Sequence, residues 1–289
     1  MGIFELTYLS DELLVKAYLG IPSAIRVQRD DILTLLIQRY GHRPDLSVEV
    51  VEGAEDEEKD RVPVNDSLPG LVYCRGGINR VGMAKIPWIN DFMARGYAVI
   101  APWYRGTYGN PGRDQFGGAD CNDVLEAYRL LQSMPFVQAN AISALGFSRG
   151  SINATKLTIA ARDVHHLILW GGVADLAWTY EERIELRRML KRVVGGSPTK
   201  VPDAYQQRSP ARLAQDIPCP VLIVHGTADV QVPFRHAILM SESLRAHGKP
   251  FTVHAYEGYG HHLPPDVHQA VIDRMLEHVA HGNPTSLPH

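Results

Sequence analysis

The sequence predicts an α/β fold with a mainly parallel central sheet flanked by helices. From about residue 70 onward, short apolar segments alternate with longer segments whose apolar residues recur near helical spacing. Strands that alternate with helices of this length form βαβ units, and successive units build a parallel sheet. A serine between glycines, in the run Gly-Phe-Ser-Arg-Gly, stands between one of these strands and the next helix. Such a turn lies at the carboxyl edge of a sheet, where α/β proteins place their functional sites.

The length and composition are those of an ordinary globular protein with a large core. The chain has 289 residues, 45% of them hydrophobic, and a formal charge of −3. This balance indicates neither a nucleic-acid surface nor a membrane-binding face. We expect a single domain over residues 1–289, with an N-terminal hairpin and acidic extension at residues 1–68. Residues 69–280 form the core, and residues 175–215 form a partial cap.

The N-terminal segment predicts a hairpin and a helix. Phe4–Leu9 and Leu13–Leu19 are apolar-rich and are separated by polar residues, as in two paired strands. Arg29–Tyr40 predicts a short helix that ends at Gly41. Glu52–Asp66 is dense in acidic residues and predicts a solvated loop.

The core alternates regularly. Six strands are predicted in the core: Gly70–Cys74, Tyr97–Tyr104, Ala141–Leu145, His166–Trp170, Val221–His225 and Phe251–Tyr256. Together with the two strands of the hairpin they make a sheet of eight strands. Helices are predicted at Met83–Arg95, Ala119–Met134, Ser151–Arg162, Phe234–His247 and Pro265–Ala280, and Arg105–Gly118 is a glycine-rich loop. Residues 175–215 are mostly helical and interrupt the alternation, so we expect this segment to lie over the site.

Ser148 is the candidate nucleophile. It is the centre of Gly146-Phe147-Ser148-Arg149-Gly150, and this pattern between a strand and a helix is typical of a nucleophile elbow. The strained turn exposes the serine hydroxyl, and the N-terminus of the following helix favours negative charge beside it. The alternative is an ordinary turn in which Ser148 only caps the helix.

An aspartate and a histidine follow Ser148 on later loops. Asp229 comes after the strand Val221–His225, and His261 comes after the strand Phe251–Tyr256. In the α/β-hydrolase fold, the acid and then the base follow the serine in this order, each on a loop after a later strand. A serine hydroxyl needs a base, and the base needs an orienting acid. We therefore predict a triad of Ser148, Asp229 and His261, and favour His261 over the adjacent His262. Alternatively, Asp229 caps the next helix.

Two backbone donors would form an oxyanion hole beside the elbow. One is the N–H of Arg149, and the second is the N–H of Gly77 or Ile78, in the loop after the first core strand. Glycines there allow the backbone to approach a ligand closely. Arg75 in the same loop either binds a carboxylate or carbonyl of the substrate or pairs with an acidic residue at the surface.

Cysteine usage and the N-terminus favour a cytoplasmic protein without a cofactor. Cys74, Cys121 and Cys219 are odd in number and far apart, so they predict three buried thiols in a reducing compartment. The first residues show neither a signal peptide nor a membrane span. We expect no metal and no cofactor, no nucleic-acid or membrane partner, and a small-molecule or peptide substrate; self-association is left open.

The segment from about Pro69 to about Val279 resembles the catalytic domain of the prolyl oligopeptidase family of serine peptidases. The similar motifs are Tyr104–Gly109, Phe116–Asp120 with Asp123, Gly171–Leu176, Tyr205 with Arg208–Pro210, Val224–Pro233 and Tyr256–His261. The resemblance implies an α/β-hydrolase fold and a triad of Ser148, Asp229 and His261. The chain departs from the family at the elbow, where Gly-x-Ser-Tyr-Gly-Gly is usual, and at Arg75, where the family has His or Tyr.

Two further functions remain open beside a serine peptidase. Fewer than seventy residues precede the first core strand, whereas one propeller blade takes roughly 40–45 residues. We therefore expect a peptidase that lacks the family's β-propeller and has an acyl-enzyme intermediate. The alternatives are a carboxylesterase of the dienelactone-hydrolase type, which shares this machinery, and a non-catalytic binding protein on the same fold.

Overall fold

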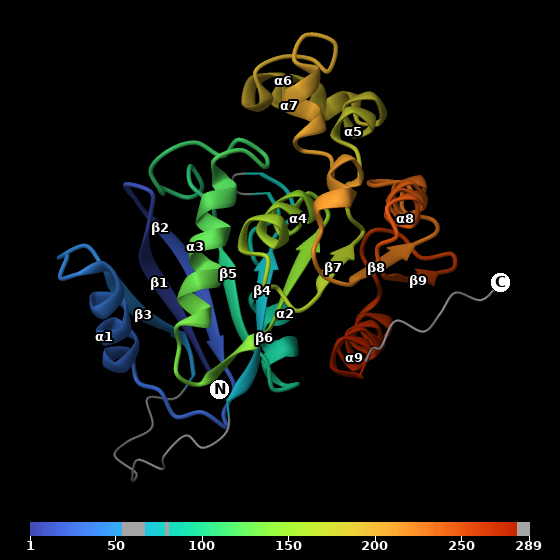
Figure 1. The fold of residues 1–289 in the computed structure, drawn as a ribbon. Coiled ribbons are helices and arrows are strands. Elements are labelled where there is room, and N and C mark those ends of the chain that lie inside the picture. The colour runs from blue at the N-terminus through green and yellow to red at the C-terminus, as the bar shows by residue number, and fades with distance from the viewer. Residues whose placement is uncertain (54–66, 79–80, 282–289) are drawn as a thin grey trace. The chain divides into compact units, whose positions relative to one another are not determined.

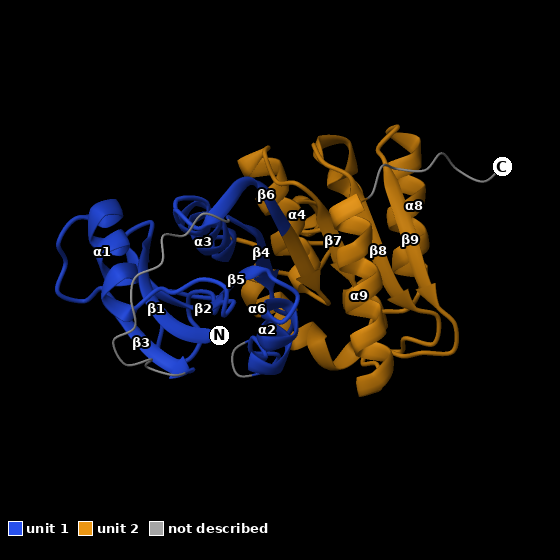
Figure 2. Cartoon of the chain, turned by 90° about the horizontal axis from the view of Figure 1, so that it is seen from below, with its two compact units in different colours: residues 1–114, 119–143 blue, residues 115–118, 144–289 orange. Residues whose placement is uncertain are grey.

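The computed structural model describes residues 1–53, 67–78 and 81–281. The chain forms two compact units (Figure 2): unit 1 comprises residues 1–114 and 119–143, and unit 2 comprises residues 115–118 and 144–289. None of the described helices combines the length and the apolar character needed to cross a bilayer. The sheet is mostly parallel, as the sequence predicts, and helices flank it (Figure 1).

Unit 1 begins with the predicted hairpin. Strands β1 (Gly2–Ser10) and β2 (Leu13–Ile21) pair in antiparallel register. β2 pairs with β5 (Ala98–Pro102), which runs parallel to β4 (Leu68–Cys74). The strand order in unit 1 is β3-β1-β2-β5-β4-β6. The hairpin therefore extends a parallel core with antiparallel strands.

Strand β3 (Ser47–Glu52) is a ninth strand that the sequence analysis missed. It pairs with β1, and four of its six residues are exposed. An exposed edge strand that contains Glu49 and Glu52 has neither the apolar run nor the clean alternation of a buried strand. Most of the predicted acidic loop, Glu52–Asp66, lies outside the described residues.

The helices of unit 1 lie close to their predicted positions. α1 (Arg29–Tyr40) has the predicted bounds and ends at Gly41, whose φ is 77°. α2 (Ile86–Met93) starts three residues later than predicted, because Pro87 occupies its first turn and proline is favoured at the start of a helix over its interior. α3 (Asp120–Gln132) buries one apolar face.

Unit 2 contains a parallel sheet in the order β6-β7-β8-β9. The strands are β6 (Val137–Phe147), which starts in unit 1, β7 (Leu167–Trp170), β8 (Val221–Gly226) and β9 (Phe251–Tyr256). β7 and β8 are buried along their whole length, which is why they are continuous apolar runs in the sequence. The accompanying helices are α4 (Gly150–Ala161), α8 (Arg235–Ala246) and α9 (Pro265–His281).

The segment 175–215 is mostly helical, as predicted. It contains α5 (Leu176–Glu182), η1 (Ile184–Leu186), α6 (Arg187–Val194), α7 (Pro202–Gln206) and η2 (Pro210–Asp216). α5, α6 and α7 form a separate helical cluster (Figure 1), and η2 packs against α4 and α8. We call this segment the cap.

Candidate active site

Ser148 lies in a strained turn between β6 and α4. Its φ is 55°, a left-handed conformation that costs a non-glycine residue about 1–2 kcal/mol. The Ser148 N–H donates to the carbonyl of Trp170 at 2.9 Å, and the Ser148 carbonyl accepts from Ser151 N at 3.1 Å and from Val173 N at 3.3 Å. The turn is therefore fixed from both sides, as in a nucleophile elbow.

Gly146 is required by close packing at the turn. A Cβ at this position would lie 2.5 Å from Ser151 Cα and 2.6 Å from the Gly150 carbonyl oxygen. Arg149 is the N-cap residue of α4, so its backbone N–H lies at the positive end of the helix dipole. This is where the sequence predicts one oxyanion donor.

Asp229 is held by the loop that follows β8. Its Oδ1 accepts from Gln231 N at 2.8 Å and from Val232 N at 2.9 Å. α8 begins only at Arg235, and its N-cap is Phe234, so Asp229 is not the cap that the alternative interpretation required. We call residues 229–232 the acid loop.

The environment of Asp229 favours its ionised form. Burial would raise the pKa of this carboxyl, but hydrogen bonds from His225 and His261 and from Val232 N hold the pKa well below its usual range. Asp229 is only 5% exposed. A buried carboxylate with several donors is suited to orienting a histidine and stabilising its protonated form.

His261, and not His262, contacts this carboxylate. His261 Nδ1 lies 2.7 Å from Asp229 Oδ2, and His261 is buried whereas His262 is exposed. An ionised carboxylate only accepts, so Nδ1 carries a hydrogen, and in the neutral ring the lone pair then lies on Nε2. The residue before the acid loop also contacts the segment before His261, because Ala228 N donates to the Tyr259 carbonyl at 2.9 Å.

The end of β7 contacts both the elbow and the histidine. Ser148 N bonds to Trp170 O, and the next residue, Gly171, has φ 52° and lies directly against the His261 ring: a Cβ there would be 3.1 Å from His261 Nδ1. Phe147, which precedes the serine, has its ring centroid 4.9 Å from that of His261. The structure thus brings the elbow and the Asp229–His261 pair into one part of unit 2.

His225, the last residue of the predicted strand Val221–His225, is a further residue at the site. Its Nε2 lies 2.8 Å from the Val232 carbonyl oxygen and 3.5 Å from Asp229 Oδ2. A carbonyl oxygen can only accept, so Nε2 carries a hydrogen that also faces the carboxylate. The motif Val224-His225-Gly226 marks the end of the strand but does not reveal this contact.

The other predicted site residues lie in unit 1. Gly77 has φ 62° and lies in a turn so tight that a Cβ would be 2.1 Å from the Val81 carbonyl oxygen; Ile78 accepts from Val81 N in the same turn. Both are half-buried. The glycine is thus needed for the conformation of this loop, and the oxyanion role of its N–H groups stays a prediction.

Arg75 is fully buried in unit 1. Its guanidinium donates to the carbonyls of Trp103 and Gly76, each at 2.9 Å, and to Thr107 Oγ1 at 2.8 Å. It also lies 3.8 Å from the carboxylate of Asp114. The expected acidic partner therefore exists, but inside the unit and not at the surface. These contacts favour a structural role for Arg75 over contact with a substrate.

No set of three or more histidine, cysteine, aspartate or glutamate side chains is placed to hold a metal ion within residues 1–53, 67–78 and 81–281. The three cysteines, Cys74, Cys121 and Cys219, are buried free thiols, as predicted.

Comparison with known proteins identifies relatives of this chain. The family model of the prolyl oligopeptidase family matches residues 85–281. The chain is 40% identical over 209 residues to an uncharacterized peptidase, YtmA, of Bacillus subtilis (strain 168), a match that covers 72% of this chain and 81% of that protein. It is 26% identical over 216 residues to dipeptidyl-peptidase 5 of Porphyromonas gingivalis, covering 68% of this chain and 31% of that one.

Solved structures share the fold. Acylaminoacyl peptidase of Pyrococcus horikoshii superposes with a TM-score of 0.73 at 14% sequence identity, covering 99% of this chain and 42% of that one. Puromycin hydrolase superposes with a TM-score of 0.71 at 19% identity, covering 98% of this chain and 40% of that one. The chain spans most of the Bacillus relative but less than half of these longer proteins.

Proposed function

The chain belongs to the prolyl oligopeptidase family and is a serine hydrolase, and we propose that it is a peptidase that cleaves short peptides or aminoacyl amides with a triad of Ser148, His261 and Asp229. The observation that carries this proposal is the 2.7 Å contact between Asp229 Oδ2 and His261 Nδ1 beside the elbow. Because this contact occupies Nδ1, the other ring nitrogen of His261, Nε2, is the proposed base.

In this mechanism, Ser148 Oγ attacks the carbonyl carbon of the scissile bond while His261 Nε2 takes the hydroxyl proton. His261 then returns the proton to the leaving group, and an acyl-enzyme remains on Ser148. Water, activated by the same histidine, releases the acid and regenerates the serine. Asp229 orients His261 and stabilises its protonated form.

Negative charge on the tetrahedral intermediate would be stabilised by backbone donors. The Arg149 N–H at the start of α4 is one donor in the proposal, and the N–H of Gly77 or Ile78 is the second. The position of Arg149 at the helix N-terminus supports the first assignment. We also propose that the enzyme is cytoplasmic, which its buried free thiols support.

The family and the relatives' names support a peptide substrate. YtmA is named a peptidase, and other relatives are named dipeptidyl peptidases. In the described part of the chain, the residues before β4 form β1, β2, α1 and β3, all of which belong to unit 1, and none forms a propeller blade. We therefore expect the cap to control which substrates reach Ser148.

A fluorophosphonate probe followed by peptide mapping tests the nucleophile. We expect label on Ser148 in the parent protein and none in S148A. A panel of p-nitrophenyl esters and aminoacyl or prolyl p-nitroanilides then tests the substrate class. Turnover of esters without turnover of any anilide would assign a carboxylesterase. If the folded protein shows neither labelling nor turnover, the proposed enzymatic function is contradicted and a binding protein is favoured.

A further inference from the structure

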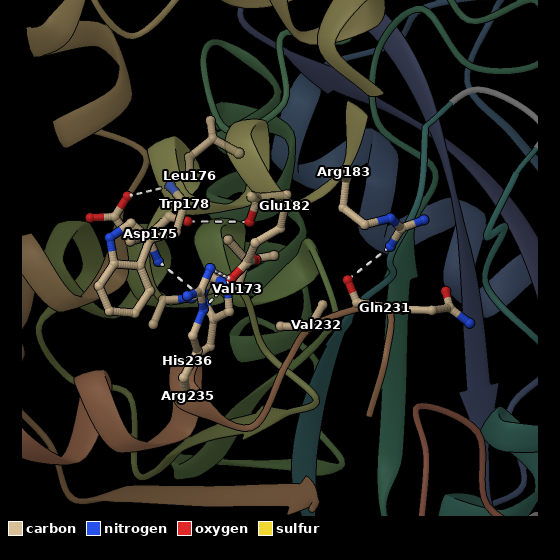
Figure 3. A network of polar contacts seen from close by, with 12 residues as sticks. Val173, Asp175, Leu176, Trp178, Glu182, Arg183, Gln231, Val232, Arg235 and His236 are labelled. Carbon is tan, nitrogen blue, oxygen red and sulfur yellow. Dashed lines mark hydrogen bonds and ion pairs between the residues drawn. The ribbon is translucent and has the colours of Figure 1, made fainter. Parts of the chain in front are cut away.

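Arg183, at the end of the first cap helix, reaches the acid loop. Its Nη1 donates to the carbonyl oxygen of Gln231 at 2.8 Å (Figure 3). Its Nε pairs with Glu185. The Arg183 side chain is 25% exposed. This contact joins the cap to the loop of the proposed catalytic acid, although the two residues are 48 positions apart in the chain.

The acceptor belongs to the peptide group that holds Asp229. The Gln231 carbonyl and the Val232 N–H are the two ends of one peptide group, and that N–H donates to Asp229 Oδ1 at 2.9 Å. A cation that donates to the carbonyl polarises the peptide and strengthens its N–H as a donor. Arg183 therefore acts on one oxygen of Asp229 while the other oxygen contacts His261.

Neighbouring contacts fix the backbone from which Arg183 extends. Glu182, which precedes it, forms an ion pair with Arg235 and lies 2.9 Å from His236 Nε2. His236 is buried, and its Nδ1 accepts from Ala174 N at 3.1 Å. Figure 3 shows these side chains converging between α5 and the start of α8.

The N-terminus of α5 is held by its N-cap residue, Asp175. Asp175 Oδ1 accepts from Ala177 N at 2.8 Å and from Trp178 N at 3.1 Å. The guanidinium of Arg235 lies 5.0 Å from the centroid of the Trp178 ring, which adds a cation–π contact. Contacts within unit 2 therefore fix both ends of α5. They hold the backbone of Arg183 in the position from which its side chain reaches Gln231.

We propose that Arg183 is a positioning residue for the reaction: through the Gln231–Val232 peptide it keeps Asp229 Oδ2 directed at His261. The proposal rests on the proposed function, in which Asp229 is the acid of the triad. It gives the cap a second role beside substrate access, because a residue of the cap contacts the loop of the proposed catalytic acid.

Four variants test it with one aminoacyl p-nitroanilide or p-nitrophenyl ester that the parent hydrolyses. R183Q removes the cation, and R183K restores a cation without the guanidinium fork. E185Q removes the ion pair but leaves the Gln231 contact intact. R188Q removes an exposed arginine of α6 that has no contact with the acid loop in the described structure. Thermal unfolding is measured for each variant.

We expect kcat of R183Q to fall about three- to tenfold, since one partly exposed charged hydrogen bond is lost. KM should change less than kcat, because Arg183 acts through Asp229 and not on the substrate. R183K should recover part of kcat, while E185Q and R188Q should match the parent. All four should unfold within about 3 °C of the parent, as surface substitutions usually do.

An R183Q enzyme with the parent's kcat would overturn the proposal. So would a loss that appears equally in R188Q, or a loss in KM alone, which would indicate substrate contact. S148A is measured in parallel. If S148A is inactive and R183Q is normal, only the role of Arg183 fails; if S148A keeps its activity, the proposed function fails and the role of Arg183 fails with it.

Discussion

Oδ2 of Asp229 lies 2.7 Å from Nδ1 of His261, while Oδ1 of the same carboxylate is occupied by two backbone N–H groups of the acid loop. The two oxygens therefore have different tasks: one fixes the loop and the other orients the ring. His262, the next residue, is exposed. Because only the first of these adjacent histidines is buried against Asp229, replacing each in turn tests which one is the catalytic base.

We expect H261A to lower kcat by about a thousandfold or more, because removal of a triad base generally does so. H262A should stay within about threefold of the parent, as expected for an exposed side chain outside the reaction. Steady-state kinetics with one p-nitrophenyl ester measures both variants. A greater loss in H262A than in H261A would move the base by one position.

Gly171 should be as important for activity as for folding. A methyl group in G171A would lie 3.1 Å from His261 Nδ1, so the ring must shift by a few tenths of an ångström. We expect kcat to fall about three- to tenfold, because a misplacement of about 1 Å can cost a hundredfold and this shift is smaller. The measurement is kcat per folded molecule, with folding checked by circular dichroism.

G248A is the matched control for G171A. Gly248 has φ 62°, and no atom lies within 4 Å of the place that an alanine Cβ would occupy there, so G248A has the left-handed strain without the steric contact. It should lose about 1–2 kcal/mol of unfolding free energy and keep the parent's kcat. Equal losses of kcat in both variants would show that backbone strain, and not displacement of His261, explains the effect.

The order of the strands and helices could be predicted because the core is regular. β9 and α1 have the predicted bounds: Phe251–Tyr256 is a short run of strand-forming residues, and Gly41 stops the helix. β3 could not be predicted, since its pairing with β1 is a tertiary contact and its side chains are mostly exposed. The alternation of apolar and polar residues reveals a strand through its buried face, and an exposed edge strand buries few side chains.

The contact between Asp229 and His261 was predictable from the sequence, but the contacts that support it were not. Ser148, Asp229 and His261 each occupy a motif whose order along the chain is set by the fold. The contact of Arg183 with the acid loop depends on how the cap and the loop fold together. The contact of His225 with Asp229 depends on the path of the chain after β8. The burial of Arg75 could not be predicted, because its acceptors, among them the carbonyl of Trp103, are contributed by another strand end.

Breaking the buried ion pair of Arg105 and Asp123 should destabilise unit 1. Arg105 donates from its backbone N at 2.7 Å and from Nη2 at 2.6 Å to the Asp123 carboxylate, which is fully buried. Removing one partner of such a pair leaves a buried charge uncompensated. We expect D123N to lose about 3–5 kcal/mol of unfolding free energy in urea titrations.

D11N is the control for D123N. Asp11 also pairs with Arg105, at 2.8 Å, but half of its side chain is exposed, and exposed pairs contribute about 0–1 kcal/mol. A loss in D11N as large as that in D123N would show that the charge of Arg105, and not the burial of its partner, decides the stability.

Histidines near the C-terminal helix should make unit 2 unstable in acid. His166 and His254 are 5% and 6% exposed. Burial lowers the pKa of each to about 4, helped at His166 by His165 and His278 and at His254 by Arg274 and His278. The unfolded histidine has a pKa of about 6.5. Between these values the unfolded chain binds more protons, so the stabilisation is complete above pH 6.5 and is lost as the pH falls toward 4.

Substitution of either histidine should therefore flatten the acid side of the stability curve. We expect H166N and H254N each to reduce the slope of unfolding free energy against pH in this window, even where the variant is less stable at neutral pH. Urea titrations at half-unit steps of pH from the parent and both variants give the slopes. H247N, which changes an exposed histidine after α8, should keep the parent's slope. Slopes for H166N and H254N equal to that of H247N would show that these rings already titrate as freely in the folded protein as in the unfolded chain.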